Sequence, residues 1–301
     1  MQGSISPLLT VKNLTVRFGG ITALNDVSFT VKPHSITALI GPNGAGKTTV
    51  FNCITGFYRP TQGSLTLAHD GRHWDLVQLL GAPPRARDAL DPRTFPSKLY
   101  YYWFGGSHLV TRAGVARTFQ NIRLFPEMTV FENLLVAQHL RANRNPFQGL
   151  FLTPAYRLRE KELVTTAAQW LDIVGLGGLG NELAAALPYG HQRRLEIARA
   201  MCTNPRLVCL DEPAAGLNPT ETDDLARLIK RLNEEFKVTV FVIEHDMSLV
   251  MDISHEVVVL NYGQVIAANS PASVRQDPAV LAAYLGTDEE EAIHPTDRGS
   301  P

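Results

Sequence analysis

Residues 36–49 read ITALIGPNGAGKTT, and this stretch decides the fold. ITALI is an apolar, β-branched run typical of a buried strand. The next nine residues, 41–49, have the spacing G-x-x-x-x-G-K-T, and a helical pattern begins near residue 46. A strand that passes through a glycine-rich turn into a helix is the context in which this spacing indicates a phosphate-binding loop. We therefore predict an α/β fold built around such a loop.

The residue types in the loop suit a nucleotide and its metal ion. Glycines permit turns that aim backbone N–H groups at phosphates, and the helix N-terminus adds its positive dipole. Lys47 supplies a point charge to the phosphates, and the Thr48 hydroxyl can reach magnesium. The predicted contacts to ATP from this loop are Gly41, Asn43, Gly44, Ala45, Gly46, Lys47, Thr48 and Thr49.

Bulk composition excludes several classes of protein. The 301 residues can bury a substantial core, and 28 basic against 29 acidic residues leave no global field that would favour nucleic acid. No apolar run approaches the length of about 18 residues that a membrane helix needs. The N-terminus lacks the pattern of a signal peptide, and the three cysteines lack metal-ligand spacing. These features favour a cytoplasmic protein with no nucleic-acid partner.

The periodicity along the chain predicts two kinds of region. Closely spaced β-branched runs from residue 8 to 37, ITALI included, favour an antiparallel sheet at the start. Apolar runs in RLVCLDEP, VTVFVIEH and EVVVLNYG indicate buried parallel strands. Helices are predicted at 46–55, 129–140, 156–174, 191–203, 220–235 and 246–252. The stretch from about 129 to 190 has no candidate strand, so we expect it to form a separate helical subdomain.

A second motif, LVCLDEP at 207–213, places two carboxylates at the end of a buried strand. Ligands of open α/β sheets bind at the carboxyl ends of their strands. Asp211 suits a partner of magnesium, either as a direct ligand or through a bound water, and Glu212 is then placed to polarise an attacking water. Phosphate loop, metal carboxylate and base are together the parts that phosphoryl transfer to water requires.

A third motif, LPYGHQRRLEIARA at 187–200, opens a helix directly after a proline, an aromatic residue and a glycine. Its free N–H groups and positive dipole would suit an anion.

In order along the chain, GPNGAGKTT, ARTFQN, LPYGHQRRLEIARA, LVCLDEP, AAGLNP and IEHD resemble the nucleotide-binding subunits of ABC (ATP-binding cassette) transporters. The resemblance implies the P-loop NTPase fold of ABC ATPases, with a mixed or parallel core sheet, an N-terminal antiparallel β subdomain and an α-helical subdomain. It also implies ATP and Mg²⁺ as cofactors.

The resemblance assigns further site residues. Gln120 matches the glutamine that reaches magnesium and the attacking water, so the implied magnesium ligands are Thr48, Gln120 and Asp211. His245 matches the histidine that touches the γ-phosphate, and it joins Glu212 and Gln120 as a catalytic residue. Phe18 matches the aromatic ring that stacks on adenine.

Residues 188–191 match the signature segment that meets the nucleotide of the opposite subunit, usually LSGGQ. This sequence departs from that pattern, because Pro188, Tyr189 and His191 replace Ser, Gly and Gln, and only Gly190 is kept. Pro188 offers no hydrogen-bond donor. We expect the Gly190 and His191 amides and the helix dipole to carry binding across the dimer.

A finer resemblance is to the ATPase subunits of branched-chain amino-acid importers, the LivG type. It rests on RTFQNIRLFPEMTVFENLLVA, YGHQRRLEIARA, DEPAAGLNPTET, IEHDMSLVMDIS and AYLG. It implies transmembrane permease subunits, a second ATPase subunit (LivF-like or a second copy) and, indirectly, a periplasmic binding protein, at the inner face of the cell membrane. Urea and amide importers and lipopolysaccharide exporters remain alternatives within the family.

Proteins of other classes fit less well. Soluble ABC proteins of translation or DNA repair usually carry two cassettes or a long coiled coil, and this chain shows neither. A phosphate-loop kinase would need an arginine-rich lid, and a GTPase would need an Asn-Lys-x-Asp base reader.

The expected organisation is one ABC ATPase domain at 1–286 and a disordered acidic tail at 287–301. Within the domain we expect an antiparallel part at 8–37 and 63–69, a helical subdomain at 121–190 and a RecA-like core elsewhere. Residues 70–110 are an insertion relative to the family and contain the cluster LYYYWF, 99–104. Its aromatic residues either fold back on the neighbouring sheet or dock a partner subunit.

Overall fold

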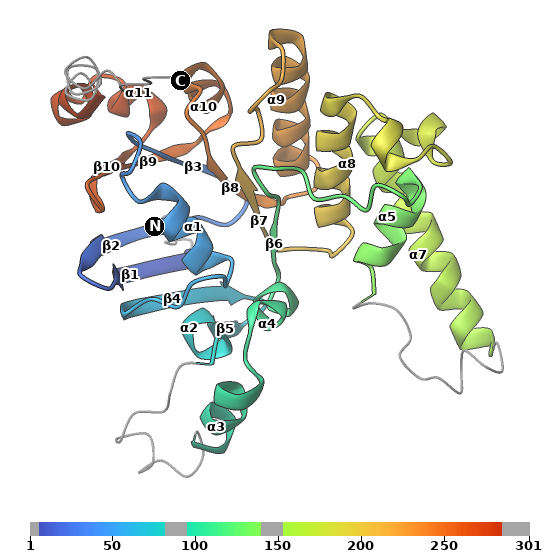
Figure 1. The fold of residues 1–301 in the computed structure, drawn as a ribbon, viewed down its shortest axis with the longest axis horizontal. Coiled ribbons are helices and arrows are strands. Elements are labelled where there is room, and N and C mark those ends of the chain that lie inside the picture. Colours follow the sequence, from blue (N-terminus) through green and yellow to red (C-terminus); the bar gives the residue numbers. More distant parts are fainter. Residues whose placement is uncertain (1–5, 82–94, 140–152, 285–301) are drawn as a thin grey trace, which may run out of the picture.

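The computed structural model describes residues 6–81, 95–139 and 153–284. Two β-sheets lie side by side, and helices α5, α7 and α8 stand together at one flank of the molecule (Figure 1). Two parts of the predicted organisation lie outside the described residues. They are residues 82–94 of the insertion and the expected acidic tail at 287–301.

The N-terminal sheet is antiparallel, as the alternating sequence predicts. Its strands are β1 (Leu9–Phe18), β2 (Ile21–Val31), β4 (Gln62–His69) and β5 (Arg72–Asp75), in the order β2-β1-β4-β5. Leu9 of β1 pairs with Val31 on one side and with Leu67 on the other, and all three side chains are fully buried. This sheet therefore has one face packed into a core, as alternating strands require.

The second sheet is mixed and carries the candidate site. Its strands are β3 (Ile36–Ile40), β6 (Val115–Arg117), β7 (Leu207–Asp211), β8 (Thr239–Ile243), β9 (Glu256–Asn261) and β10 (Gln264–Asn269), in the order β10-β9-β3-β8-β7-β6. All strands except the edge strand β10 run parallel to their neighbours. Every residue of β3, β7 and β8 is buried. The carboxyl ends of these parallel strands meet at one edge.

One expectation about the strands is wrong. ITALI belongs to the mixed sheet as β3, between β8 and β9, and not to the antiparallel sheet. Its proximity in sequence to β2 suggested a hairpin, but its fully apolar composition suits a strand covered on both faces. β5 and β6 were not predicted either, since they have only four and three residues. β10 was also not predicted, and its residues are exposed or half-buried.

The helices fall at all six predicted positions. They are α1 (Lys47–Ile54), α5 (Val130–Ala137), α7 (Pro154–Ile173), α8 (Tyr189–Met201), α9 (Pro219–Glu234) and α10 (Met247–Ile253), and the structure adds α11 (Pro271–Val274). Residues 278–284 are also helical. Short 3₁₀ turns, η2 (Gly177–Leu179) and η3 (Ala184–Ala186), precede α8.

The helices α5 and α7 pack on α8 and share its core. Leu134 of α5 and Leu171 of α7 belong to the same buried cluster as Leu195 of α8 and Leu210 of β7. The helical part is thus joined to the central sheet by continuous apolar packing through α8.

The insertion forms three helices beside β5: α2 (Leu76–Leu79), α3 (Phe95–Phe104) and α4 (Ser107–Arg112). Tyr101 packs against the buried cluster beneath the antiparallel sheet, while Tyr100, Tyr102, Trp103 and Phe104 are 47–71% exposed. Most of these aromatic residues do not fold back on the sheet. Within the described residues, no helix is long and apolar enough to cross a membrane.

Candidate functional site

The phosphate loop joins β3 to α1, and its glycines are required by their surroundings. Gly41 has φ 149°, and a Cβ there would lie 2.1 Å from the Leu260 carbonyl oxygen. Gly46 has φ 99° at the N-cap of α1, and its Cβ would lie 2.7 Å from the Leu24 side chain. Gly44 meets no such obstacle, but its φ of 77° favours glycine.

Lys47 is held inside the loop by backbone carbonyl groups. Its Nζ donates hydrogen bonds to the carbonyl oxygens of Gly41 at 2.6 Å and Pro42 at 2.9 Å. Burial lowers the pKa of Lys47, and the negative charge of Glu212 opposes that shift. Asn43, Gly44 and Thr48 are exposed, Gly46 and Thr49 are half-buried, and Ala45 is buried.

Phe18 ends β1 with 47% of its surface exposed. Its ring makes an edge contact with Tyr58, with ring centroids 5.3 Å apart. Tyr58 is also exposed, and sequence reasoning missed it, because the residue lies in a turn with no motif. The two rings offer the flat, amphipathic surface on which a base can stack.

Asp211 lies at the end of β7 in a buried network with Arg117. The Arg117 guanidinium donates to Asp211 Oδ2 at 3.2 Å, and also to the side chains of Asn52 and Thr55. Burial raises the pKa of Asp211, and the charge of Arg117 opposes the shift. Arg117 was not predicted as a site residue; its partners are far apart in sequence and only the fold brings them together.

Glu212, Gln120 and His245 meet at the edge where β7 and β8 end. Gln120 Nε2 donates to Glu212 Oε2 at 2.7 Å, and His245 Nδ1 lies 3.9 Å from the same oxygen. Glu212 has φ 44°, a left-handed conformation that strains a residue with a side chain by about 1–3 kcal/mol. The structure therefore brings together the three residues expected to be catalytic.

Glu244, directly before His245, is a buried carboxylate that joins two loops. It accepts hydrogen bonds from the backbone N–H groups of Ala214 at 2.8 Å and His245 at 3.1 Å. Burial raises its pKa in spite of these bonds. It fixes the loop after Glu212 against the end of β8.

The N-terminus of α8 has no side-chain cap. Pro188 is its N-cap and makes no side-chain hydrogen bond to the helix. Gly190 is buried beside Glu221 of α9, and a Cβ on Gly190 would lie 2.6 Å from Glu221 Oε1. Tyr189 lies next to Gly216 of the loop AGLN, 215–218. His191 Nδ1 is buried, and it has no hydrogen-bond partner among the described residues.

One turn further along α8, a buried ion pair clamps the loop that carries Gln120. Arg193 pairs with Glu196 at 2.9 Å and donates to the carbonyl oxygens of Phe119 at 2.7 Å and Gln120 at 2.8 Å. Glu196 in turn accepts from the backbone N–H groups of Phe119 and Arg123. Sequence reasoning missed this pair, because RRLEIARA has the pattern of an ordinary packing helix.

The three cysteines are buried thiols that form no disulfide within the described residues, as their apolar contexts suggest. Burial raises the pKa of Cys53 to about 12, so its thiolate is not formed at neutral pH. Within the described residues, no group of three or more His, Cys, Asp and Glu side chains could hold a metal ion.

Comparison with known proteins identifies the family. Residues 24–215 match the family described as ABC transporter. The chain belongs to the ABC transporter family. It is therefore an ABC ATPase, a protein that binds and hydrolyses ATP.

Relatives with assigned roles cover nearly the whole cassette. This chain is 50% identical over 280 residues to the high-affinity branched-chain amino acid transport ATP-binding protein BraF of Pseudomonas aeruginosa. The alignment covers 93% of this chain and 98% of that protein. It is 46% identical, with the same coverage, to the corresponding protein LivG of Escherichia coli K12. Residues 264–290 match a second family, described as branched-chain amino acid ATP-binding cassette transporter.

Solved structures agree with the fold. A nucleotide-free ATP-binding cassette from an ABC transporter superimposes on this one with a TM-score of 0.70 at 29% identity, covering 93% of this chain and 99% of that chain. A transporter cassette in its ADP conformation gives a TM-score of 0.69 at 30% identity, with the same coverage. The two-sheet architecture with a helical flank is thus that of ABC cassettes.

Proposed function

We propose that this cassette is the ATP-hydrolysing subunit of an importer for branched-chain amino acids. The observation that carries the proposal is the match of residues 264–290 to the branched-chain type of cassette, together with 46–50% identity to LivG and BraF over nearly the whole chain. The segment 264–290 lies outside the part shared by ABC transporters in general, at 24–215, so it points to the branched-chain type specifically.

The proposed hydrolysis uses Glu212 as the general base. Its carboxylate lies at the strand edge beside the phosphate loop, where it can accept a proton from a water aimed at the γ-phosphate. The Gln120 amide, bonded at 2.7 Å, keeps that carboxylate in place and can orient the same water. His245 is 66% exposed at the mouth of the site, so its ring is free to reach the γ-phosphate.

Thr48, Gln120 and Asp211 are the proposed ligands of Mg²⁺. A hydroxyl, an amide oxygen and a carboxylate form the all-oxygen set that Mg²⁺ prefers. Gln120 gives its amide nitrogen to Glu212, which leaves its oxygen for the metal. Asp211 is bonded to Arg117 through Oδ2 alone, so Oδ1 remains. Bound Mg²⁺ would neutralise phosphate charge during transfer.

The proposed partner across the site is a second ATPase subunit, either a LivF-like protein or another copy. The phosphate-loop helix α1 contacts β2 and β8, whereas α8 contacts α5, α7 and β6, so the two phosphate-binding features lie on different parts of one cassette. The free end of α8 is therefore available to a nucleotide held by a partner.

Transmembrane permease subunits, fed by a periplasmic binding protein, are the other proposed partners and would hold the cassette at the cytoplasmic face of the membrane. A cavity of about 380 Å³ opens between the core and the helical flank, and residues as far apart as Thr111 of α4 and His139 after α5 line it. Phe119, next to Gln120, also lines this cavity. A permease segment docked there would touch the loop that carries Gln120.

The test combines turnover with import. Glu212→Gln keeps size and hydrogen bonding but removes the base, so ATP hydrolysis by the reconstituted transporter should fall about a hundredfold or more while ATP still binds. Glu160→Gln, an exposed change on α7, is the matched control. The gene should also restore leucine, isoleucine and valine uptake to cells that lack their own cassette. Restored uptake of urea or amides alone would contradict the substrate proposed here.

A further inference from the structure

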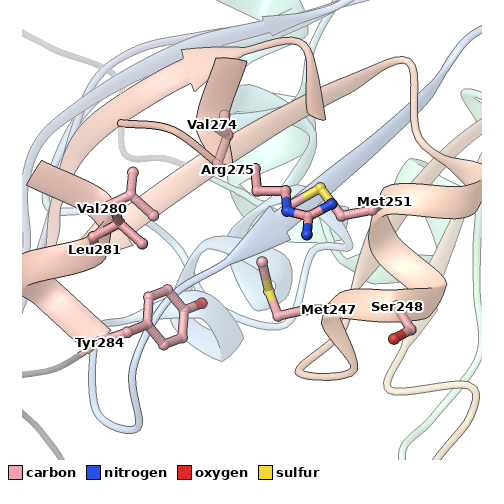
Figure 2. Close-up of a pocket in the computed structure, with 8 residues that line it drawn as sticks. All are labelled: Met247, Ser248, Met251, Val274, Arg275, Val280, Leu281 and Tyr284. Atoms are coloured by element: carbon pink, nitrogen blue, oxygen red, sulfur yellow. The ribbon is translucent and has the colours of Figure 1, made fainter. Parts of the chain in front are cut away.

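A cavity of about 500 Å³ lies between α10 and the C-terminal helical segment 278–284, and neither Asp211 nor Glu212 lines it. Figure 2 shows Met247 and Met251 of α10 facing the side chains of that segment across the cavity. The residues that line it are Met247, Ser248, Met251, Val274, Arg275, Val280, Leu281 and Tyr284. Its volume is in the range of small-molecule sites, about 300–1,000 Å³.

The lining specifies the chemistry of a ligand. Most of the side chains are apolar, and two are methionines, which adapt to ligands of irregular shape. Among the described residues that line the cavity, Arg275 is the single charged group and none is a carboxylate, and Arg275 has no ion-pair partner in the described part of the chain. An apolar chain that ends in a carboxylate satisfies both features, because a guanidinium binds a carboxylate through two parallel hydrogen bonds.

The cavity is joined to the phosphate loop by two hydrogen bonds in series. Tyr284 lines the cavity, and the Gly41 backbone forms a hydrogen bond with its hydroxyl. The Gly41 carbonyl oxygen in turn accepts from Lys47 Nζ at 2.6 Å. A ligand that packs on the Tyr284 ring would hold this chain of contacts, and with it Lys47, in place.

The C-terminal segment typical of branched-chain cassettes builds this cavity. Five of the eight lining residues lie within 264–290, the part that matches that family. The remaining three come from α10, which directly follows His245 and Asp246. The cavity therefore lies between the segment that matches the branched-chain family and α10. The segment contacts the phosphate loop through Tyr284, and α10 follows His245.

We propose that this cavity binds a short branched apolar carboxylate and that its occupancy strengthens ATP binding through Tyr284 and Gly41. Two sources of such a carboxylate fit the proposed import function: a branched-chain amino acid and its keto acid. The carboxylate and ATP both bind better when Tyr284, Gly41 and Lys47 are held in place. Each ligand that orders these residues therefore favours binding of the other. The coupling must be reciprocal, so ATP strengthens binding of the carboxylate by the same factor.

The first experiment measures ligand binding to the full chain by calorimetry with leucine, the keto acid of leucine and isoamyl alcohol. At least one of the two carboxylates should bind, with an affinity at least about tenfold above that of the alcohol, which has the same branched chain without the charge. Binding of leucine alone identifies the amino acid as the ligand, and binding of the keto acid alone identifies the keto acid. Arg275→Gln should weaken binding by about tenfold or more, whereas Arg157→Gln on α7 should not.

The second experiment measures the Kd of ATP with and without saturating carboxylate. The ligand should lower that Kd by about fivefold or more, and ATP should lower the Kd of the ligand by the same factor. Tyr284→Phe should keep ligand binding and lose most of the coupling. Absence of binding by both carboxylates, or binding indifferent to Arg275→Gln, would overturn the site. An ATP Kd unchanged by bound ligand would overturn the coupling. Neither result touches the proposed import function, which turnover and uptake test separately.

Discussion

Glu244 is a buried carboxylate that joins two loops of the site. Its protonation should make the free energy of unfolding of this chain depend on pH. A carboxyl whose pKa is raised on folding favours the folded state while it is protonated, and this contribution is lost as the pH rises through the folded pKa. Burial raises the pKa of Glu244 above its ordinary value of 4.5, so the loss falls in the window just above pH 4.5.

Glu244→Gln should remove that loss, because an amide stays neutral and its oxygen can still accept from Ala214. The Tm of the variant minus that of the wild type should therefore become more positive between about pH 5 and about pH 8. Glu160→Gln, which is exposed, gives the baseline. A difference in Tm that does not change with pH would show that Glu244 is charged in the folded state throughout this range.

The sequence was informative at the residue scale wherever function depends on local spacing. Glycine positions and Lys47 can be read from nine consecutive residues, because the loop geometry is local. Arg117 and Arg193 could not be read in this way, because their roles depend on partners brought together by the fold: Arg117 reaches Asp211 across 94 positions, and Arg193 reaches Phe119 across 74.

At the scale of elements, α8 and the loop that carries Gln120 act as one unit through Arg193. The side chain of Arg193 is fully buried, and Glu196 is 1% exposed. Arg193→Met would leave the Glu196 carboxylate buried without its partner, so the free energy of unfolding should fall by about 3–5 kcal/mol. Urea unfolding measures this loss, and Arg227→Met, exposed on α9, is the control.

Adding Glu196→Leu to Arg193→Met separates stability from positioning. Replacing a buried ion pair by apolar groups is often neutral, so the double variant should regain much of the lost stability. The kcat for ATP hydrolysis should be low in Arg193→Met and equally low in the double variant. In both variants the carbonyl groups of Phe119 and Gln120 lack the Arg193 donor that positions the loop. Full recovery of both quantities would show that the clamp has a structural role alone.

Helix α3 is the element whose side chains the sequence could not place. Its aromatic run is compatible with either core or surface, and only the structure shows Trp103 and Phe104 at 71% and 63% exposure. If α3 docks the permease, Trp103→Ser should reduce recovery of the membrane subunits and leave stability within about 0.5 kcal/mol. Tyr101→Ser, which removes a packed ring, should lower the Tm instead. Unchanged permease recovery with Trp103→Ser would exclude docking through this residue.

The sequence predicts that a strand exists more reliably than it predicts which strand pairs with it. β7, β8 and β9 are apolar runs of five or six residues, and their composition alone predicted them. β3 has the same composition, but its neighbours along the chain suggested the wrong sheet, since pairing partners are a property of the whole fold. β6 has three residues, too few for any periodicity.

At the scale of the whole molecule, we propose that the cassette presents half of a nucleotide site at the phosphate loop and the other half at the start of α8. We expect the Gly190 and His191 amides and the helix dipole to bind the γ-phosphate of ATP held by the partner. Pro188 offers no hydroxyl to the phosphate, and one neutral hydrogen bond contributes about 0.5–1.5 kcal/mol. Pro188→Ser should therefore strengthen ATP-dependent dimers modestly.

Gly190→Asp should abolish those dimers, because it adds a carboxylate at a helix end that faces phosphate. Glu221 lies against Gly190, so any side chain there also displaces a neighbour, with Glu221 Oε1 only 2.6 Å from the Cβ position. Gly190→Ala controls for that displacement: it adds the Cβ without the charge, and it should weaken dimers less than Gly190→Asp does. Size-exclusion chromatography with ATP, in a Glu212→Gln background that slows hydrolysis, measures the dimer, and nucleotide binding by the single subunit should survive all three changes. Dimers of normal strength from Gly190→Asp would mean that the start of α8 faces something other than a partner's phosphate.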